Sequence, residues 1–156
     1  VSTPVMKGQE LRIDKDAKAI KDSLRLHIKP LINAYNFFCL YANSDQIKAS
    51  RITNVKDLTN IMDLYILAKL KETVSKIDQG LANYDTIKPC EEFNKFFEVL
   101  NNWYIRRNRD RFWKSEIDED KIQAYNVLYS VLLTILEAFS PILPFTAEKI
   151  WRGLNC

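Results

Sequence analysis

Apolar residues recur at every third or fourth position along most of the chain. Between residues 14 and 42 their period is close to 3.6, which predicts one long helix. Pro30 lies inside this stretch and cannot donate a backbone hydrogen bond, so we expect a kink or a break near His27. We expect His27 to hydrogen-bond a carbonyl freed at the kink rather than to act in catalysis. Residues 43–56 are polar without a period and predict a connection.

Four further helices follow from the same pattern. A second helix is expected to begin at Asp57, a suitable N-cap, and to run to about Leu81. A third begins near Pro89, and a short fifth begins at Pro144. The fourth, residues 121–139, is apolar around most of its circumference and is therefore expected at the centre of a bundle. Its narrow polar stripe consists of Gln123, Asn126, Ser130, Thr134 and Glu137. The prediction is an all-α bundle of about five helices.

Composition removes several classes of protein and site. Three Gly and five Pro in 156 residues are too few for an all-β sandwich or a glycine-rich phosphate loop. No apolar run approaches the roughly 18 residues that span a bilayer, so we expect a soluble protein. Cys39, Cys90 and Cys156 contain no CxxC pair, which indicates neither a disulfide framework nor a zinc site and favours the cytoplasm. His27 is the single histidine, which excludes metal motifs that need two histidines.

The positive charge of the chain is concentrated in residues 106–114, which we call the basic segment. It holds five cations and one anion, a local charge of +4, whereas the whole chain has a net charge of +3. The cations are Arg106, Arg107, Arg109, Arg111 and Lys114, and the aromatic neighbours are Trp103, Tyr104, Phe112 and Trp113. Arginines interleaved with aromatic rings are typical of surfaces that neutralise phosphates and stack bases. A solvated helix end is the alternative interpretation.

Helix geometry sorts the cations of this segment. At about 100° per residue, with Leu100 on the core line, Arg107 and Arg111 of a continued third helix lie within about 20° of that line. Arg106 and Arg109 then project to the far side. Because these two have no packing role, they are the better candidates for phosphate contacts.

A cation on the core line needs a partner. The third helix must extend past the bundle, end there, or meet carboxylates. In the last case Arg107 forms an ion pair with an acid such as Glu137 or Asp63, and its loss lowers the free energy of unfolding. Trp103 lies among core positions and is expected to pack there rather than to stack on a base. Residues 112–113, a Phe and a Trp, either fold over the bundle end or remain exposed as stacking platforms.

Four segments, in order, resemble the anticodon-binding domain of isoleucyl-tRNA synthetases, a family of class I aminoacyl-tRNA synthetases. They are INAYNFFCLYAN (residues 32–43), DLYILAKL (63–70), NWYIRRNRDRFW (102–113) and SPILPFTAEKIW (140–151). The last is similar to an element that the valyl and leucyl enzymes share, whereas the third favours the isoleucyl enzymes. Residues 1–13 resemble the connector that follows the catalytic domain, which leaves residues 14–156 as the helical domain.

The resemblance implies a helical bundle that docks the anticodon stem and loop of isoleucine tRNA and lies against the catalytic domain of the same enzyme. ATP-dependent attachment of isoleucine and editing of valine belong to other domains of such an enzyme, with ATP as the implied cofactor and zinc as a second candidate. Because the HIGH and KMSKS motifs are absent from this sequence, we expect no catalysis and no cofactor in this chain. The candidate tRNA contacts are Arg106, Arg109, Arg111, Lys114, Trp113 and Arg107.

Three other interpretations remain open at this point. The chain could be a structural or protein-interaction bundle whose arginines pair internally or meet an acidic partner. It could be the same domain of a valyl-type or leucyl-type synthetase. It could also be a freestanding RNA-binding module with no synthetase parent.

Overall fold

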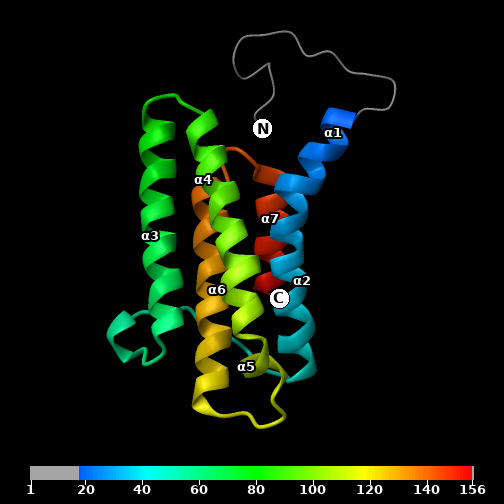
Figure 1. The fold of residues 1–156 in the computed structure, drawn as a ribbon, viewed down its shortest axis with the longest axis vertical. Helices are drawn as coiled ribbons and strands as arrows, with labels where there is room; N and C mark the ends of the chain where they lie inside the picture. The colour runs from blue at the N-terminus through cyan, green and yellow to red at the C-terminus, as the bar shows by residue number, and fades with distance from the viewer. Residues whose placement is uncertain (1–17, 156) are drawn as a thin grey trace.

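The computed structural model describes residues 18–155, and every regular element in that range is helical (Figure 1). The elements are α1 (Lys18–Ser23), η2 (Leu24–Ile28), α2 (Lys29–Ser44), η3 (Val55–Asp57), α3 (Ile61–Ala82), α4 (Ile87–Glu98), η4 (Val99–Ile105), α5 (Arg109–Trp113), α6 (Glu119–Phe139) and α7 (Pro144–Leu154). Since α1, η2 and α2 run on as one helix, and α4 continues into η4, the described residues form five long helices and the short α5. The all-α prediction is confirmed, and residues 1–13 lie outside the described range.

Pro30 bends the first helix without breaking it. The preceding turn, η2, is π-helical, and the N–H of Lys29 donates to the carbonyl of Leu24, five residues back. This wider turn lets the chain pass the proline ring, and Figure 1 shows the helix leaning outward there. The expected hydrogen bond of His27 is not formed at Nδ1, which is buried and has no hydrogen-bond partner in the described part of the chain.

The second helix begins later than the sequence pattern predicts. Its N-cap is Asn60, whose side chain accepts a hydrogen bond of 2.9 Å from the N–H of Met62. Asp57 instead ends the 3₁₀ turn η3, so the prediction that it caps this helix is wrong. At the other end of α3, a Cβ on Gly80 would lie 2.6 Å from the ring of Pro89. The glycine therefore permits the close approach of α3 and α4.

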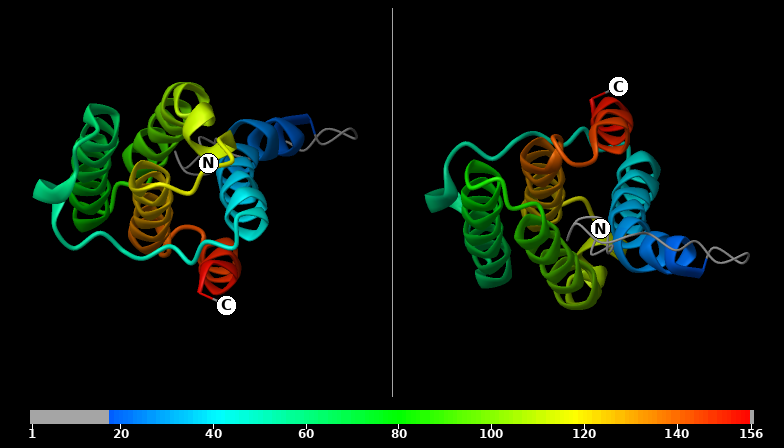
Figure 2. Two further views of the ribbon diagram at one scale, coloured as in Figure 1. Left: turned by 90° about the horizontal axis from the view of Figure 1, so that it is seen from below. Right: turned by 90° about the horizontal axis from the view of Figure 1, so that it is seen from above.

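Helix α6 is the central helix, as predicted, and the end-on views in Figure 2 place it between α3, α4 and α7. Its polar stripe is largely covered, however, because the extended connection between α2 and α3 runs along it, and only Glu137 is exposed. The N–H groups of Ser50 and Ile52 donate to Asn126 Oδ1 and Ser130 Oγ, both at 2.8 Å. Arg51 adds two hydrogen bonds to the carboxylate of Glu137, at 2.9 and 2.6 Å. The stripe thus satisfies backbone groups in the part of the connection that precedes η3 and has no regular structure.

Length and composition alone would let α6 cross a membrane, and it is the one helix of the described residues that meets this test. The expectation that no apolar run is long enough is therefore wrong for this segment. In the structure, 61% of that window is buried inside the bundle. This burial is what a core helix requires, since neighbouring helices cover its apolar surface.

Candidate nucleic-acid interface

The basic segment does not continue the third helix in the predicted phase. Residues Val99–Ile105 form the π-helical stretch η4, and a π turn holds one residue more than an α turn. One extra residue rotates everything after it by about 100°. The helix then ends at a turn around Asn108, and α5 starts with a phase of its own. Arg107 is consequently exposed, whereas Arg111 points into the bundle.

Arg111, not Arg107, forms the predicted ion pair with a buried acid. Its Nη1 and Nη2 lie 2.8 and 2.9 Å from the two carboxylate oxygens of Asp63, which is fully buried. Tyr104 donates its hydroxyl to the same carboxylate at 2.6 Å, and Asp120 contacts the guanidinium from the other side at 2.7 Å. Asp63 was correctly predicted to form an ion pair, but its partner is Arg111 and not Arg107, so the prediction for Arg107 is wrong. Glu137, the other acid considered, pairs with Arg51.

The acidic neighbours of Arg111 stabilise its charged form inside the bundle. Burial works to lower the pKa of Arg111, but hydrogen bonds to Asp63 and Asp120 outweigh it and raise that pKa. Burial and the adjacent Asp63 carboxylate raise the pKa of Tyr104 well above its ordinary value. The bidentate pair uses two of the five guanidinium N–H groups, and Asn108 and Asp120 accept hydrogen bonds from the other three, so none is spare for a phosphate. Arg111 is therefore an internal member of the bundle rather than a nucleic-acid contact.

Lys114 is also occupied. Its ammonium lies 2.5 Å from Asp118 and 3.4 Å from Asp120, and the hydrogen bond to Asp118 raises the pKa of Lys114. Its carbonyl accepts a hydrogen bond of 2.7 Å from Lys121, a residue that is 1% exposed. The lysine thus ties the loop between α5 and α6 in place. The structure does not present it as a free cation.

Three cations of the basic segment remain exposed and have no carboxylate partner among residues 18–155: Arg106, Arg107 and Arg109. The guanidinium carbon of Arg107 lies 5.6 Å from the ring centroid of Trp103, and that of Arg109 lies 5.8 Å from the centroid of Trp113. A guanidinium held over a ring keeps its N–H edge free. These three side chains can therefore neutralise phosphates.

The aromatic neighbours divide in the same way. Phe112 is 1% exposed and packs edge-on against Tyr125 and Phe37, so it folds over the bundle end. Trp113 is 53% exposed, and its indole N–H donates to the hydroxyl of Tyr41 at 2.7 Å. This bond from α2 fixes the direction of a ring that is open to solvent, which is the arrangement that base stacking needs. Sequence reasoning missed Tyr41 because no local pattern links residues 72 positions apart.

Trp103 packs as predicted. It is half-buried against the core, and its ring centroid lies 4.5 Å from that of Tyr65 on α3. The guanidinium of Arg107 lies over this ring. Its role is to support that arginine rather than to offer a free face to a base.

Beside the exposed cations lies a groove of about 510 Å³ between the first helix and the α4–η4 helix. Arg109 belongs to its wall, which makes the groove continuous with the basic segment. Its other polar lining residues are His27, Asn33, Asn94, Glu98, Asn101 and Asn102. Arg109 thus borders both the groove and the ring of Trp113.

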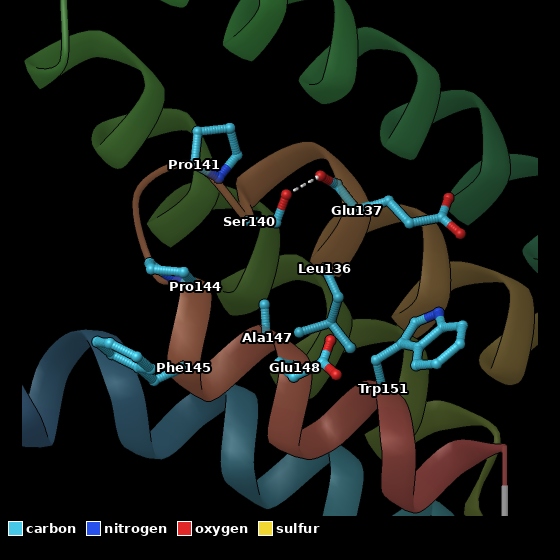
Figure 3. Close-up of a pocket in the computed structure, with 9 residues that line it drawn as sticks. All are labelled: Leu136, Glu137, Ser140, Pro141, Pro144, Phe145, Ala147, Glu148 and Trp151. Carbon is cyan, nitrogen blue, oxygen red and sulfur yellow. Dashed lines mark hydrogen bonds between the residues drawn. The ribbon is translucent and has the colours of Figure 1, made fainter.

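A second cavity, of about 620 Å³, lies elsewhere, between α6 and α7 (Figure 3). Figure 3 shows Leu136, Ala147 and Trp151 lining it, while Phe145 projects away from them. Its charged lining groups are the carboxylates Glu137 and Glu148, and none of its lining residues belongs to the basic segment. Both carboxylates are paired, Glu137 with Arg51 and Glu148 with Arg152, and the lining contains no cation. The cavity therefore offers no charged group that would hold a phosphate.

Comparison with known proteins also indicates a domain that binds RNA, over most of the chain. Residues 63–155 match the family model described as the anticodon-binding domain of tRNA ligase. Isoleucine–tRNA ligase of Rickettsia africae is 53% identical over 155 residues, which is 99% of this chain and 14% of the relative. The isoleucine–tRNA ligases of Rickettsia typhi and Rickettsia bellii are each 52% identical, over 99% and 100% of this chain and 14% of each relative. The chain therefore spans about one seventh of the length of these relatives.

Proposed function

The chain belongs to the anticodon-binding domain family of tRNA ligases, and we propose that it docks the anticodon stem and loop of isoleucine tRNA. Its similarity to isoleucine–tRNA ligases extends over nearly the whole chain, which supports the isoleucine enzyme over the valyl and leucyl ones. The observation that carries the proposal is the exposed half of the basic segment. There, Arg106, Arg107 and Arg109 have no carboxylate partner in the described range and stand beside the open ring of Trp113.

Binding by this surface has two parts. The three guanidiniums neutralise phosphates of the RNA backbone, which gives affinity without base information. The ring of Trp113 accepts an unpaired base of the loop, because every base has a face that stacks on an aromatic ring. Arg109 lies between these parts, since it is over the indole ring and also reaches solvent.

The activity of the longer enzyme belongs to the same proposal. The parent attaches isoleucine to its tRNA with ATP, and zinc is a second cofactor to test in that parent. This chain binds the tRNA that the catalytic domain of the parent acts on, and it carries no catalytic residue or cofactor of its own. The proposed location is the cytoplasm, in keeping with the free thiols of Cys39 and Cys90.

A binding comparison tests the proposal. The chain is titrated with isoleucine tRNA, with valine tRNA and with an isoleucine tRNA whose anticodon is exchanged, all at one salt concentration. We expect the tightest binding for the isoleucine tRNA that keeps its own anticodon. The logarithm of the binding constant should fall with the logarithm of the salt concentration at a slope of roughly −2, because three phosphates of a largely single-stranded loop are neutralised. Equal affinity for all three would favour a structural or protein-interaction bundle. A preference for valine tRNA would favour the valyl-type domain.

A further inference from the structure

We propose that the groove between the first helix and the α4–η4 helix holds one unpaired base of the bound RNA and that His27 hydrogen-bonds to it. This inference rests on the RNA-binding function proposed above. The groove has a volume of about 510 Å³, inside the range of about 300 to 1,000 Å³ typical of ligand pockets. It is bordered by Arg109, which also lies over Trp113, so a backbone phosphate held there brings the neighbouring base to the groove.

The first reason is the state of His27. Its Nδ1 is buried and has no hydrogen-bond partner in the described part of the protein. A buried polar atom left without a partner is costly, and the native examples call for an explanation. His27 lines the groove, but its Nδ1 is itself buried, so pairing with a ligand atom requires the imidazole to turn toward the opening.

The second reason is the backbone around the groove. Both walls contain a π-helical stretch, η2 on one side and η4 on the other, and such stretches are frequent at functional sites. The amide of Asn101 joins the walls by donating hydrogen bonds of 3.0 Å to the carbonyls of Pro30 and Phe97. This bridge fixes the spacing of the two walls at the level of Asn101.

The third reason is the chemistry of the lining. Asn94 and Asn102 offer amides that both donate and accept, and Glu98 offers a carboxylate with no ion-pair partner within residues 18–155. Leu26, Pro30 and Phe37 supply apolar surface, whereas Phe97 is 1% exposed and only backs the groove. Donors and acceptors beside an accessible aromatic ring match the edge and face of an unstacked base, which is how proteins recognise single-stranded RNA. Phosphate alone would not use the apolar surface, and Glu98 would repel it.

Abasic substitution of the RNA, combined with variants of His27, tests the proposal. The probe is the anticodon stem-loop of isoleucine tRNA, with each loop nucleotide replaced in turn by one that lacks its base. We expect wild-type chain to lose about tenfold in affinity at the position whose base enters the groove. His27→Ala should lose up to about tenfold on the intact RNA, the worth of one hydrogen bond, and should lose less than wild type when that base is removed. Arg106→Ala should weaken all RNAs by the same factor.

His27→Asn is the matched variant, since the amide places a polar atom where Nδ1 stood, whereas His27→Gln does not. Rescue by Asn and not by Gln, with unchanged circular dichroism for all three variants, supports a hydrogen bond at Nδ1. If His27→Ala and the abasic positions act independently, the groove does not hold a base and the inference is overturned, while salt-dependent RNA binding would still stand. Tight binding of free nucleosides would also overturn it, because the base would then need no RNA backbone. Absence of RNA binding altogether would remove the proposed function as well.

Discussion

The basic segment contains two halves of similar composition and opposite roles. Arg111, Phe112 and Lys114 face inward and are held by acids and rings of α3, α6 and the loop before α6. Arg106, Arg107 and Arg109 face outward and have no carboxylate partner in the described residues. Residue type and spacing in sequence do not separate the halves. What separates them is whether a carboxylate from another element lies within reach, so a count of arginines overstates the phosphate-binding surface.

The largest expected effect comes from breaking the inward half. Arg111→Ala leaves the fully buried carboxylate of Asp63 without its cation, and we expect the free energy of unfolding to fall by about 3 to 5 kcal/mol. Urea melts measure the loss. Arg107→Ala is the matched control in the outward half and should stay within about 0.5 kcal/mol of wild type. A large loss for Arg107→Ala with none for Arg111→Ala would reverse the comparison.

The next effect concerns the stacking ring. Trp113→Ala should weaken RNA binding by about 1 to 3 kcal/mol, the usual worth of one base stacked on an aromatic side chain, and should change urea melts little. Tyr41→Phe keeps the ring but removes the hydroxyl that accepts the indole N–H, so we expect a smaller loss. If Trp113→Ala leaves affinity for the anticodon stem-loop unchanged, the indole is not a stacking platform.

Salt titration of RNA affinity tests whether the three outward arginines contact phosphates. Arg106→Ala, Arg107→Ala and Arg109→Ala should each make the slope of log K against log salt less steep by about 0.7, because each removes one phosphate contact to a single-stranded loop. The effect should be the same for every RNA sequence. Lys71→Ala, an exposed lysine on α3, is the control and should leave the slope unchanged. An unchanged slope for any of the three arginines removes it from the interface.

The five long helices and the position of the basic segment after the third helix could be predicted from the sequence. Apolar periodicity predicted α6 as the central helix, and helix geometry placed Arg111 on the core line. Arg107 was misplaced because the π-helical stretch η4 adds a residue to the turn, and its anchor, the hydrogen bond from Asn101 to Pro30, joins residues 71 positions apart. The sequence does not show what covers the polar stripe on α6, because its partners, two backbone N–H groups and the side chain of Arg51, belong to an irregular connection that has no pattern of its own.

The smallest expected effect is a difference in acid sensitivity. Burial works to raise the pKa of Asp120, but hydrogen bonds and charge from Arg111 and Lys114 hold it below the ordinary value of 3.8. A carboxyl whose pKa is lower in the folded state contributes stability above its unfolded pKa and loses it as pH falls through the folded pKa. Stability should therefore decline below about pH 4.

Asp120→Asn tests this by removing the titrating group. Urea melts at pH 7, 5, 4 and 3 should show a variant less stable than wild type at pH 7, with a smaller further loss toward pH 3 because one fewer proton is taken up on unfolding. Arg107→Ala should follow the wild-type pH profile, since its guanidinium has no carboxylate partner in the described residues. Parallel profiles for wild type and Asp120→Asn would show that Asp120 gains nothing from Arg111. Of the two carboxylates at Arg111, Asp63 alone would then stabilise the fold.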